Sequence, residues 1–500
     1  MESDLKRVQR VIVLGGGSAG FMAALALKKR MPDLSVTVIR SKDIGIIGVG
    51  EGSTTALTGF LHQYLQVPPK QFYEMAVPTW KLGLKFVWGP RPHFFYSFDS
   101  VHLTANYPDL RKPISFYCDA DMECVEPMTA LMAGGKVFER APNGAPKFNN
   151  SFAYHFENEK FVSFLETFAI QLGINIVEDK VEQVLIDESG VTGLSMASGR
   201  TETADLFVDC SGFVSLLLGK TLKEPFINFK SSLFCDRAVV GGWARKPGEP
   251  IYPYTTCSTM DSGWLWQIEH EHRINRGYVY CSSFISDEEA EREFRSKSPD
   301  ITQTRVVKFV SGRYERNFVK NVVAIGNASG FVEPLEATAL GVIATQSRVL
   351  ADSLAAADRQ LRATHARYIN YHHSAIWDAT RAFIAIHYKY NTRIDTPFWQ
   401  ECREKTDLAG AGDMMDYYRE NGPCSFWGPL VVGHEDPFGI SGYITLLLGQ
   451  RVEHRMNFTP TDQEMQKVAA IRQHYRQMAQ QGLTAEQVLA AIRDPNWKWQ

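Results

Sequence analysis

Short apolar runs alternate with helical patterns in the first part of the chain. Residues 11–14 read VIVL and predict a buried strand, and the pattern from Phe21 to about Arg30 is helical. A second apolar run over residues 35–39 has the spacing that a strand–helix–strand unit requires. Strands that alternate with helices in this way predict an α/β fold with a parallel sheet.

Further periodic patterns continue to the end of the chain. The other expected elements are, in order, a helix over residues 60–66, one strand over 80–87, loops over 99–150, a helix over 152–173, a meander of strands over 181–186, 191–196 and 204–209, strands over 263–269 and 277–284, and helices over 338–357, 378–388 and 462–479 and after Thr484. A capping box is expected at Thr461 and Glu464, and Thr484 and Gln487 are expected to cap the last helix. Because helical patterns dominate the later residues, we expect two regions, 1–345 and 346–500.

The composition narrows the class of protein. A chain of 500 residues is too long for one simple core, and hydrophobic and aromatic contents of 44% and 12% fit a globular enzyme with a large pocket. The net charge of −3 gives no electrostatic reason to bind nucleic acid or an anionic membrane. The N-terminus lacks a signal-peptide core, and no run of about 18 apolar residues is present. We therefore expect a cytoplasmic protein.

Cysteine and histidine usage predicts no metal site. The eight cysteines are scattered, without a CxxC pair or a Cys/His cluster, which is typical of reduced thiols. His372 and His373 lie in a helical pattern and are expected to be surface or core residues, not ligands.

The first strand is followed by a G-x-G-x-x-G turn and a helix, the context of a dinucleotide-binding loop. The candidate binding residues are Gly15, Gly17, Ser18, Ala19 and Gly20. At the end of the second strand, where an acid usually binds the ribose, the chain has Arg40. Asp43 is a weak substitute, so the adenosine contact is left open.

A second glycine-rich stretch, residues 44–55, reads IGIIGVGEGSTT. Glycines at positions 45, 48, 50 and 52 imply a backbone that runs close against a flat or charged group, and an ordinary glycine-rich loop is the alternative.

Residues 325–342, IGNASGFVEPLEATALGV, combine a strand exit, a turn at Gly326 and a helix that opens near Thr338. Helix N-termini bind anions through their free backbone N–H groups. The turn also carries Glu333 and Glu336 beside apolar neighbours, and burying an unpaired carboxylate is costly. The alternative is that both acids are solvated or cap the helix.

Lysine and aromatic positions complete the candidate chemistry. In the alternating stretch 80–87, Lys81 and Lys85 share one face, and Leu82, Leu84 and Phe86 share the other. Lysines on the outer face of a strand are usually solvated. Residues 93–98 form a dense aromatic patch, which is more often core than pocket.

Taken in order, these motifs resemble those of the flavin-dependent halogenases of the tryptophan-halogenase type. The similar segments are GGGSAG (15–20), IGIIGVGEGST (44–54), WKLGLKF (80–86), ADLFVDCSG (204–212), KEPFINF (223–229), SGWLWQI (262–268), FVEPLEAT (331–338) and DTPFWQ (395–400). They span roughly residues 8–400, and the lysine and FVEPLEAT segments are the most specific.

The resemblance implies a glutathione-reductase-like FAD-binding core of the two-dinucleotide type over residues 1–345, with inserted strands and loops, and a helical region over 346–500 that covers the substrate. A separate NAD(P)H-dependent reductase supplies FADH2, which with O₂ and halide yields hypohalous acid. Gly48, Gly50, Glu51 and Gly326 join the residues of the first glycine loop as FAD contacts.

The resemblance also assigns the reactive groups. Lys81 holds hypohalous acid, as a hydrogen-bond donor or as a haloamine, and Glu336 stabilises the cationic intermediate and accepts its proton. Thr338 and Ala339 match the halide pocket. The substrate pocket is expected at Tyr96, Phe98, Trp264 and Trp266, although the two tryptophans are core aromatics in the alternative interpretation.

Departures from the family pattern bear on the substrate. Glu269 replaces the signature proline, and Ala337 and Ala339 replace serine and glycine. After residue 405 the segment that grips the amino acid part of tryptophan does not align, since Glu420 follows the pair Tyr417–Tyr418 too soon. We therefore expect a larger pocket for indoles or phenols, with bromide or chloride as the halide.

Two other functions and the assembly state stay open. A flavin monooxygenase that hydroxylates or epoxidises needs reduced flavin and O₂ but not Lys81. A catalytically inactive flavin-binding component needs neither Lys81 nor Glu336. The chain is expected to act on a small aromatic substrate without nucleic acid or membrane, and a homo-oligomer is an open alternative.

Overall fold

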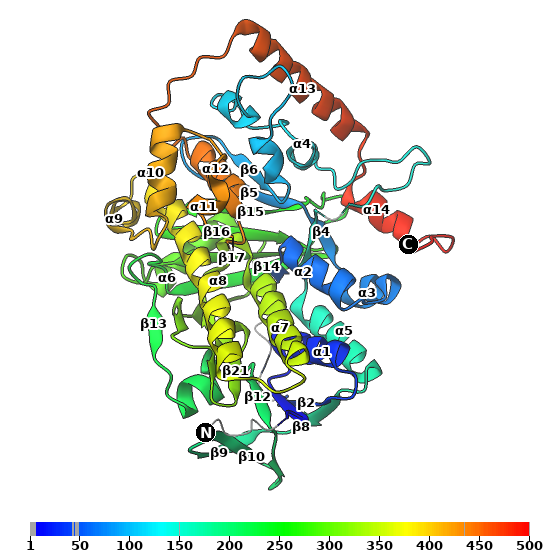
Figure 1. Ribbon diagram of the computed structural model, residues 1–500. Coiled ribbons are helices and arrows are strands. Elements are labelled where there is room, and N and C mark those ends of the chain that lie inside the picture. Colours follow the sequence, from blue (N-terminus) through cyan, green and yellow to red (C-terminus); the bar gives the residue numbers. More distant parts are fainter. Residues whose placement is uncertain (1–6, 43–44, 46–49, 150, 435, 500) are drawn as a thin grey trace.

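A computed structural model describes residues 7–42, 45, 50–149, 151–434 and 436–499. Two sequence candidates, Asp43 and Gly48, lie outside the described residues. The predicted α/β class is confirmed, because helices and strands of several sheets mix along the chain (Figure 1). Within the described part of the chain, no helix is long and apolar enough to cross a membrane.

A mainly parallel sheet holds the N-terminal unit. Its order in the described residues is β20–β21–β12–β1–β2–β8. The bounds are β1 Arg10–Leu14, β2 Ser35–Arg40, β8 Asn175–Glu178, β12 Leu206–Asp209, β20 Phe318–Val319 and β21 Val322–Ala324. Strand β1 pairs in parallel with β2 and β12, and helix α1 (Ser18–Arg30) follows it, so the predicted strand–turn–helix–strand unit is confirmed.

The expected meander is wrong in its third strand. Strands β9 (Val181–Asp187), β10 (Gly190–Met196) and β11 (Thr201–Glu202) form a separate antiparallel sheet. Strand β12 instead enters the parallel sheet between β1 and β21. All four of its residues are buried, as a central strand covered on both faces requires.

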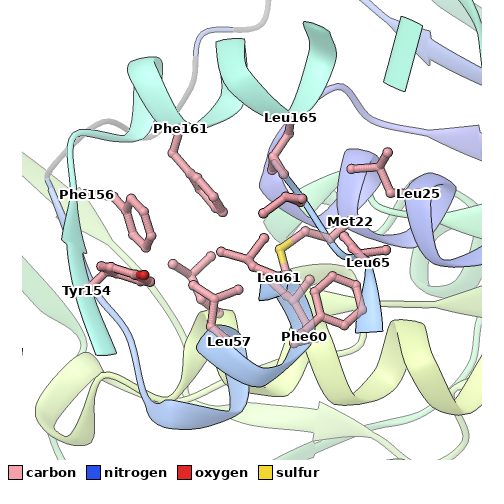
Figure 2. Packing of buried hydrophobic residues seen from close by; sticks show 14 of the residues in the cluster. Met22, Leu25, Leu57, Phe60, Leu61, Leu65, Tyr154, Phe156, Phe161 and Leu165 are labelled. Atoms are coloured by element: carbon pink, nitrogen blue, oxygen red, sulfur yellow. The ribbon is translucent and has the colours of Figure 1, made fainter. Parts of the chain in front are cut away.

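Apolar side chains from helices far apart in sequence form the core beside this sheet. Helix α1 packs against α5 (Asn158–Gln171) and α7 (Ala339–Ala356). Figure 2 shows side chains of α1, α5 and the segment Thr55–Tyr64 pointing toward one another; those labelled include Met22, Leu25, Leu57, Phe60, Leu61, Phe161 and Leu165. This packing holds the first glycine loop and α7 in one rigid unit.

A seven-stranded sheet forms the second layer. Its order in the described residues is β18–β14–β17–β16–β15–β5–β6. The bounds are β5 Gly83–Val87, β6 Phe94–Ser97, β14 Arg237–Ala244, β15 Tyr254–Met260, β16 Gly263–Glu269, β17 Arg273–Tyr280 and β18 Thr304–Lys308. The strand expected at 277–284 is therefore β17, which begins and ends four residues earlier.

The single strand expected over residues 80–87 is two strands in two sheets. Strand β4 (Thr79–Lys81) pairs with β7 (Ala153–Phe156), whereas β5 pairs with β6 and β15. Between them, the N–H of Leu82 bonds to the carbonyl of Pro253. Leu82 packs in a different apolar cluster from Leu84 and Phe86, so the common face expected for these three residues is wrong.

The remaining elements correct three further expectations. The helix expected over residues 152–173 is preceded by a strand. Strand β7 pairs with both β3 (Glu51–Gly52) and β4, and α5 begins after it. Residues 60–66 contain a π-helical turn, Phe60–Tyr64, after helix α2 (Thr55–Gly59). Residues 99–150 are not all loop, because they contain α4 (Pro127–Ala133) and two 3₁₀ turns.

Helices make up most of the later chain. Strands β13 (Phe226–Asn228), β19 (Gly312–Tyr314) and β22 (Gly330–Phe331) form a small sheet before them. The other helices are α3 Pro69–Ala76, α6 Asp287–Lys297, α8 Ala363–Tyr390, α9 Pro397–Lys405, α10 Gly412–Asn421, α11 Gly428–Val431, α12 Gly439–Gly449, α13 Asp462–Gln481 and α14 Ala485–Ile492. Helix α8 is much longer than the expected 378–388 and runs along the molecule beside both large sheets (Figure 1). The expected caps at Thr461 and Thr484 are present.

Candidate active site

The first glycine loop has the geometry of a phosphate-binding turn. Gly15 has φ +128°, and a Cβ there would lie 2.2 Å from the carbonyl oxygen of Cys210, while a Cβ on Gly20 would lie 1.8 Å from that of Gly15. A Cβ on Gly17 would meet nothing within 4 Å. Gly17 is also the N-cap of α1, so the first N–H groups of the helix, from Ser18 and Ala19, have no side-chain cap at this position.

Two substitutions in this loop separate folding from flavin binding. Gly15→Ala is expected to destabilise the fold, because its Cβ meets backbone that cannot move away. Gly17→Glu is expected to leave the melting temperature near that of the wild type and to weaken FAD binding about tenfold or more, because a carboxylate would face the pyrophosphate. Thermal unfolding and FAD fluorescence titration measure the two effects. Gly17→Ala is the matched control, and normal FAD affinity in Gly17→Glu would contradict this placement of the cofactor.

Arg40, at the position where an acid usually binds the ribose, is paired with acidic side chains of the protein. Its guanidinium forms an ion pair with Glu166 at 2.6 Å and lies 3.8 Å from Glu178. Its stem packs against the loop, since a Cβ on Gly16 would lie 2.5 Å from Arg40 Cβ. The charge of Arg40 is thus compensated by α5 and β8.

The turn at Gly326 touches the same loop. Gly326 has φ +65°, and a Cβ there would lie 3.1 Å from the Cβ of Ala19. Its N–H donates to Gln346 Oε1 at 2.9 Å. The exit of β21 and the start of α1 are therefore packed together.

The second glycine-rich stretch runs against the FVEPLEAT turn. A Cβ on Gly52 would lie 3.2 Å from Ala337 Cβ, 3.3 Å from Thr255 Oγ1 and 3.4 Å from Lys81 Nζ. A Cβ on Gly341, in the first turn of α7, would lie 2.6 Å from Thr54 Oγ1. The contact is tight on both sides, which favours a close backbone approach over an ordinary glycine-rich loop.

Glu51 belongs to the same stretch and is partly enclosed. Asn158 Nδ2 donates to Glu51 Oε1 at 2.5 Å. Burial raises the pKa of the Glu51 carboxyl to about 7, although the bond from Asn158 opposes the shift. The neighbouring Gly50 has φ +72°, and a Cβ there would lie 2.7 Å from both His270 Nε2 and Asn275 Nδ2.

Lys81 is fully buried, which corrects the expectation of a solvated lysine. Its ammonium donates to the carbonyl of Ser53 at 3.1 Å and lies 5.2 Å from the ring centroid of Phe98. Burial lowers the pKa of Lys81 to about 8, while Glu336 and Cys257 favour the charged form. Both the ammonium and the amine form of Lys81 are therefore populated at slightly alkaline pH.

Lys85 differs from Lys81 in its surroundings. It is only half-buried, and its ammonium lies 5.9 Å and 5.8 Å from the ring centroids of Phe95 and Tyr254. The two lysines belong to different sheets, so the close alternation in sequence does not place them together.

Both carboxylates of the FVEPLEAT turn are buried, so the interpretation as solvated acids is wrong. Glu333 Oε1 accepts bonds from Trp264 Nε1, at 3.0 Å, and from the hydroxyl of Tyr388. Burial raises the pKa of Glu333 to about 7. Glu336 Oε1 lies 2.7 Å from Nε2 of His387, a contact without the angle of a hydrogen bond. Adjacent residues in the last turn of α8 therefore hold the two acids.

The turn ends in a left-handed residue and opens helix α7. Ala337, after the 3₁₀ turn Pro334–Glu336, has φ +54°, which is unusual for a residue other than glycine. Thr338 is the N-cap of α7 and makes no side-chain cap bond. The contacts of Glu333 and Glu336 are with side chains of β16 and α8. The N–H groups that begin at Ala339 are free of side-chain partners.

A cluster of aromatic rings packs around Phe383 of α8. Burial raises the pKa of Tyr96 well above its usual value, and the charges of Glu336 and Asp436 add to the shift. The ring centroid of Phe383 lies 6.0 Å from that of Tyr96 and 4.9 Å from that of Tyr443, and it stacks on Phe438 at 3.7 Å. Sequence reasoning missed Phe383, Phe438 and Tyr443, because no motif marks α8 or α12.

The two signature tryptophans lie in the apolar cluster behind the turn. Trp264 is fully buried, and its indole N–H donates a hydrogen bond to Glu333. Trp266 is nearly buried, and its ring would meet a Cβ on Gly277 at 2.5 Å. Their assignment to the substrate pocket stays a prediction.

Among the described residues, no group of three or more His, Cys, Asp or Glu side chains is placed to hold a metal ion. All eight cysteines are free thiols, and seven of them are buried.

Comparison with known proteins shows which family the chain belongs to. The profile of the tryptophan halogenase family matches residues 10–466, further than the motifs reach. Tryptophan 7-halogenase RebH of Lentzea aerocolonigenes is 31% identical over 89% of each chain. The structure of MibH, a lanthipeptide tryptophan 5-halogenase, superposes with a TM-score of 0.89 at 36% identity over 99% of this chain and 95% of that one. BrvH, a flavin-dependent halogenase from Brevundimonas sp. BAL3, gives a TM-score of 0.85 at 26% identity over 98% and 100% of the chains.

The fold and these relatives define a class of enzyme, the flavin-dependent halogenases. Within it, the chain belongs to the tryptophan halogenase family.

Proposed function

We propose that this enzyme uses FADH2, O₂ and a halide to halogenate an electron-rich aromatic ring, with Lys81 and Glu336 as the reactive side chains. One observation carries the proposal: a fully buried lysine bonded to the second glycine-rich stretch and a buried glutamate in the FVEPLEAT turn interact electrostatically within one site. Burying each charged group is costly, which favours a functional role for both.

The cofactor fits the two glycine-rich segments. Free N–H groups at the start of α1 and the open space at Gly17 suit a pyrophosphate. The residues that would hold FAD are Gly15, Gly17, Ser18, Ala19, Gly20, Gly50, Glu51 and Gly326, with Gly48 outside the described residues. When bound and reduced by a separate NAD(P)H-dependent reductase, FAD supplies hypohalous acid from O₂ and halide. In this proposal residues 1–345 form the FAD-binding core and 346–500 cover the substrate.

The chain's own groups then act on hypohalous acid and substrate. The N–H groups that begin at Thr338 and Ala339 bind the halide, because a helix N-terminus attracts anions. The ammonium of Lys81 donates to the oxygen of hypohalous acid and makes it a better leaving group, or its amine carries the halogen. Glu336 stabilises the positive charge on the halogenated ring and takes its proton.

The substrate we propose is an indole or phenol that does not depend on recognition of a free amino acid. Tyr418, which could have met an amino or carboxylate group, is buried and directs its hydroxyl to the carbonyl of Val452. RebH is a halogenase of tryptophan, whereas MibH acts on a lanthipeptide tryptophan. A ring within a larger molecule, such as tryptophan in a peptide, therefore fits this chain better than free tryptophan.

Competition between substrates tests this proposal. With FAD, a flavin reductase, NADH and bromide or chloride, indole and a tryptophan-containing peptide are expected to be halogenated about tenfold or more efficiently than free tryptophan, because the sequence after residue 405 does not align with the segment that grips the amino acid part. Product mass spectrometry on equimolar mixtures gives the ratio directly. A clear preference for free tryptophan would contradict the proposed substrate and leave the halogenase chemistry intact.

A further inference from the structure

The orientation of one histidine ring at the site is fixed by its neighbours. His387 lies in the last turn of α8 and is fully buried. Its Nδ1 is 3.0 Å from the carbonyl oxygen of Phe383, which can only accept a hydrogen bond. Nδ1 therefore carries a proton, and the other ring nitrogen, Nε2, is the one that faces Glu336.

The contact between Nε2 and Glu336 requires a second proton. The nitrogen lies 2.7 Å from Oε1 of Glu336, within hydrogen-bond distance. If both groups lacked a proton on this side, two lone pairs would face each other in a buried site, which is repulsive. The contact is bent at rest, a common state of catalytic hydrogen bonds before substrate binds. A proton held between Nε2 and Oε1 removes the repulsion.

Other groups around Glu336 cannot take this place. Among the described residues, titratable side chains of neighbouring elements that interact with the carboxylate include Lys81 on β4, Tyr96 on β6 and Cys257 on β15. Burial raises the pKa values of Tyr96 and Cys257 well above neutrality, so both stay neutral. Lys81 is bonded to Ser53 on the cofactor side.

Packing holds the imidazole in position. Its ring centroid lies 5.2 Å from that of Phe86 and 5.4 Å from that of Phe383. The backbone is also anchored, since Trp88 Nε1 donates to the carbonyl of His387 at 3.0 Å. A ring with one hydrogen bond, one close contact to a carboxylate and aromatic neighbours is preorganised.

We infer that His387 is the positioning residue for proton removal: it bridges the Phe383 carbonyl and Glu336 Oε1, holds a proton against that oxygen and leaves Oε2 to act as the base. This inference rests on the proposed role of Glu336. Once the halogen is bonded to the ring carbon, the C–H bond of that carbon breaks. Its electron pair restores the aromatic ring, and its proton bonds to Oε2 of Glu336. The N–H of His387 stabilises the carboxylate before the transfer and keeps Oε2 aimed at the ring.

The test compares the same substitution at two buried histidines of α8. His387→Gln is expected to lower the halogenation rate roughly tenfold or more, a part of the roughly 10²- to 10⁴-fold that a positioned base contributes. It is also expected to create a deuterium isotope effect with indole deuterated at the reacting carbon, because proton removal becomes slow. His373→Gln, about 21 Å earlier along the helix, is expected to show neither change.

A slower His387→Gln enzyme without an isotope effect would overturn the inference, as would a wild-type rate. Glu336→Gln in the same assay distinguishes a failure of the proposed function from a failure of the inference about His387. If it keeps full activity, the proposed function of Glu336 fails; if only it loses activity, the inference about His387 fails alone. Should His387→Gln not fold, proton NMR of the wild-type protein decides. A low-field N–H resonance that Glu336→Gln abolishes supports the bridge, and its absence contradicts it.

Discussion

Replacing Lys81 with alanine is expected to abolish halogenation while oxidation of reduced flavin by O₂ continues. Lys81 is the buried cation nearest the contact between the second glycine-rich stretch and the FVEPLEAT turn. Removing one preorganised donor from a water-excluded site typically lowers a rate by about 10²- to 10³-fold, and loss of a haloamine lowers it further. Halogenated product and peroxide, measured in the same reaction, report the two activities separately.

Two variants control for the space that alanine leaves. Lys81→Met keeps most of the volume of the buried stem and is expected to be as inactive as Lys81→Ala, since both lack the nitrogen. Lys85→Ala is expected to halogenate nearly as well as the wild type, because Lys85 is half-buried and packs on the rings of Phe95 and Tyr254. Loss of activity in Lys85→Ala with retention in Lys81→Met would reverse the assignment.

Replacing Glu336 with glutamine is expected to lower halogenation by about 10²- to 10⁴-fold, the usual contribution of a positioned base. The amide fills the same space but neither accepts the ring proton nor balances the cationic intermediate. Rates measured with a fixed supply of FADH2, beside thermal unfolding, distinguish lost chemistry from lost folding.

Glu333→Gln is the matched control, because Glu333 belongs to the same turn and is also buried. Its Oε1 accepts hydrogen bonds from Trp264 and Tyr388, so its carboxylate is already held by two donors. We expect a change in stability with a much smaller loss of activity. Equal losses in the two variants would mean that the turn as a whole, and not the carboxylate of Glu336, limits the reaction.

Local patterns in the sequence predicted the fold around the first glycine loop well. The G-x-G-x-x-G turn, its strands and α1 depend on neighbouring residues, and the structure confirms their arrangement. Pairings between distant segments were harder. The stretch 80–87 alternates like one strand but forms two. Its first part pairs with β7. Its second part begins at Gly83, which approaches β6 so closely that a Cβ would lie 2.1 Å from the carbonyl oxygen of Tyr96.

The site was predicted in part for the same reason. Lys81 and Glu336 were found because each lies in a specific motif of the family. His387 and Phe383 lie on a helix without such a motif, where a histidine is more often a core residue than a functional one. Only the path of α8 past the FVEPLEAT turn brings them to Glu336. Burial of Lys81 likewise depends on β7 and on the stretch around Ser53, which sequence periodicity does not reveal.

The most direct test of the central claim is mass spectrometry of the product formed from indole by the wild type, Lys81→Ala and Glu336→Gln. Each reaction contains FAD, a flavin reductase, NADH, O₂ and either bromide or chloride. The account predicts a product with the isotope pattern of the added halogen in the wild type and its loss in both variants. An oxygenated product in place of a halogenated one, or halogenation that is unchanged in Lys81→Ala, would contradict it.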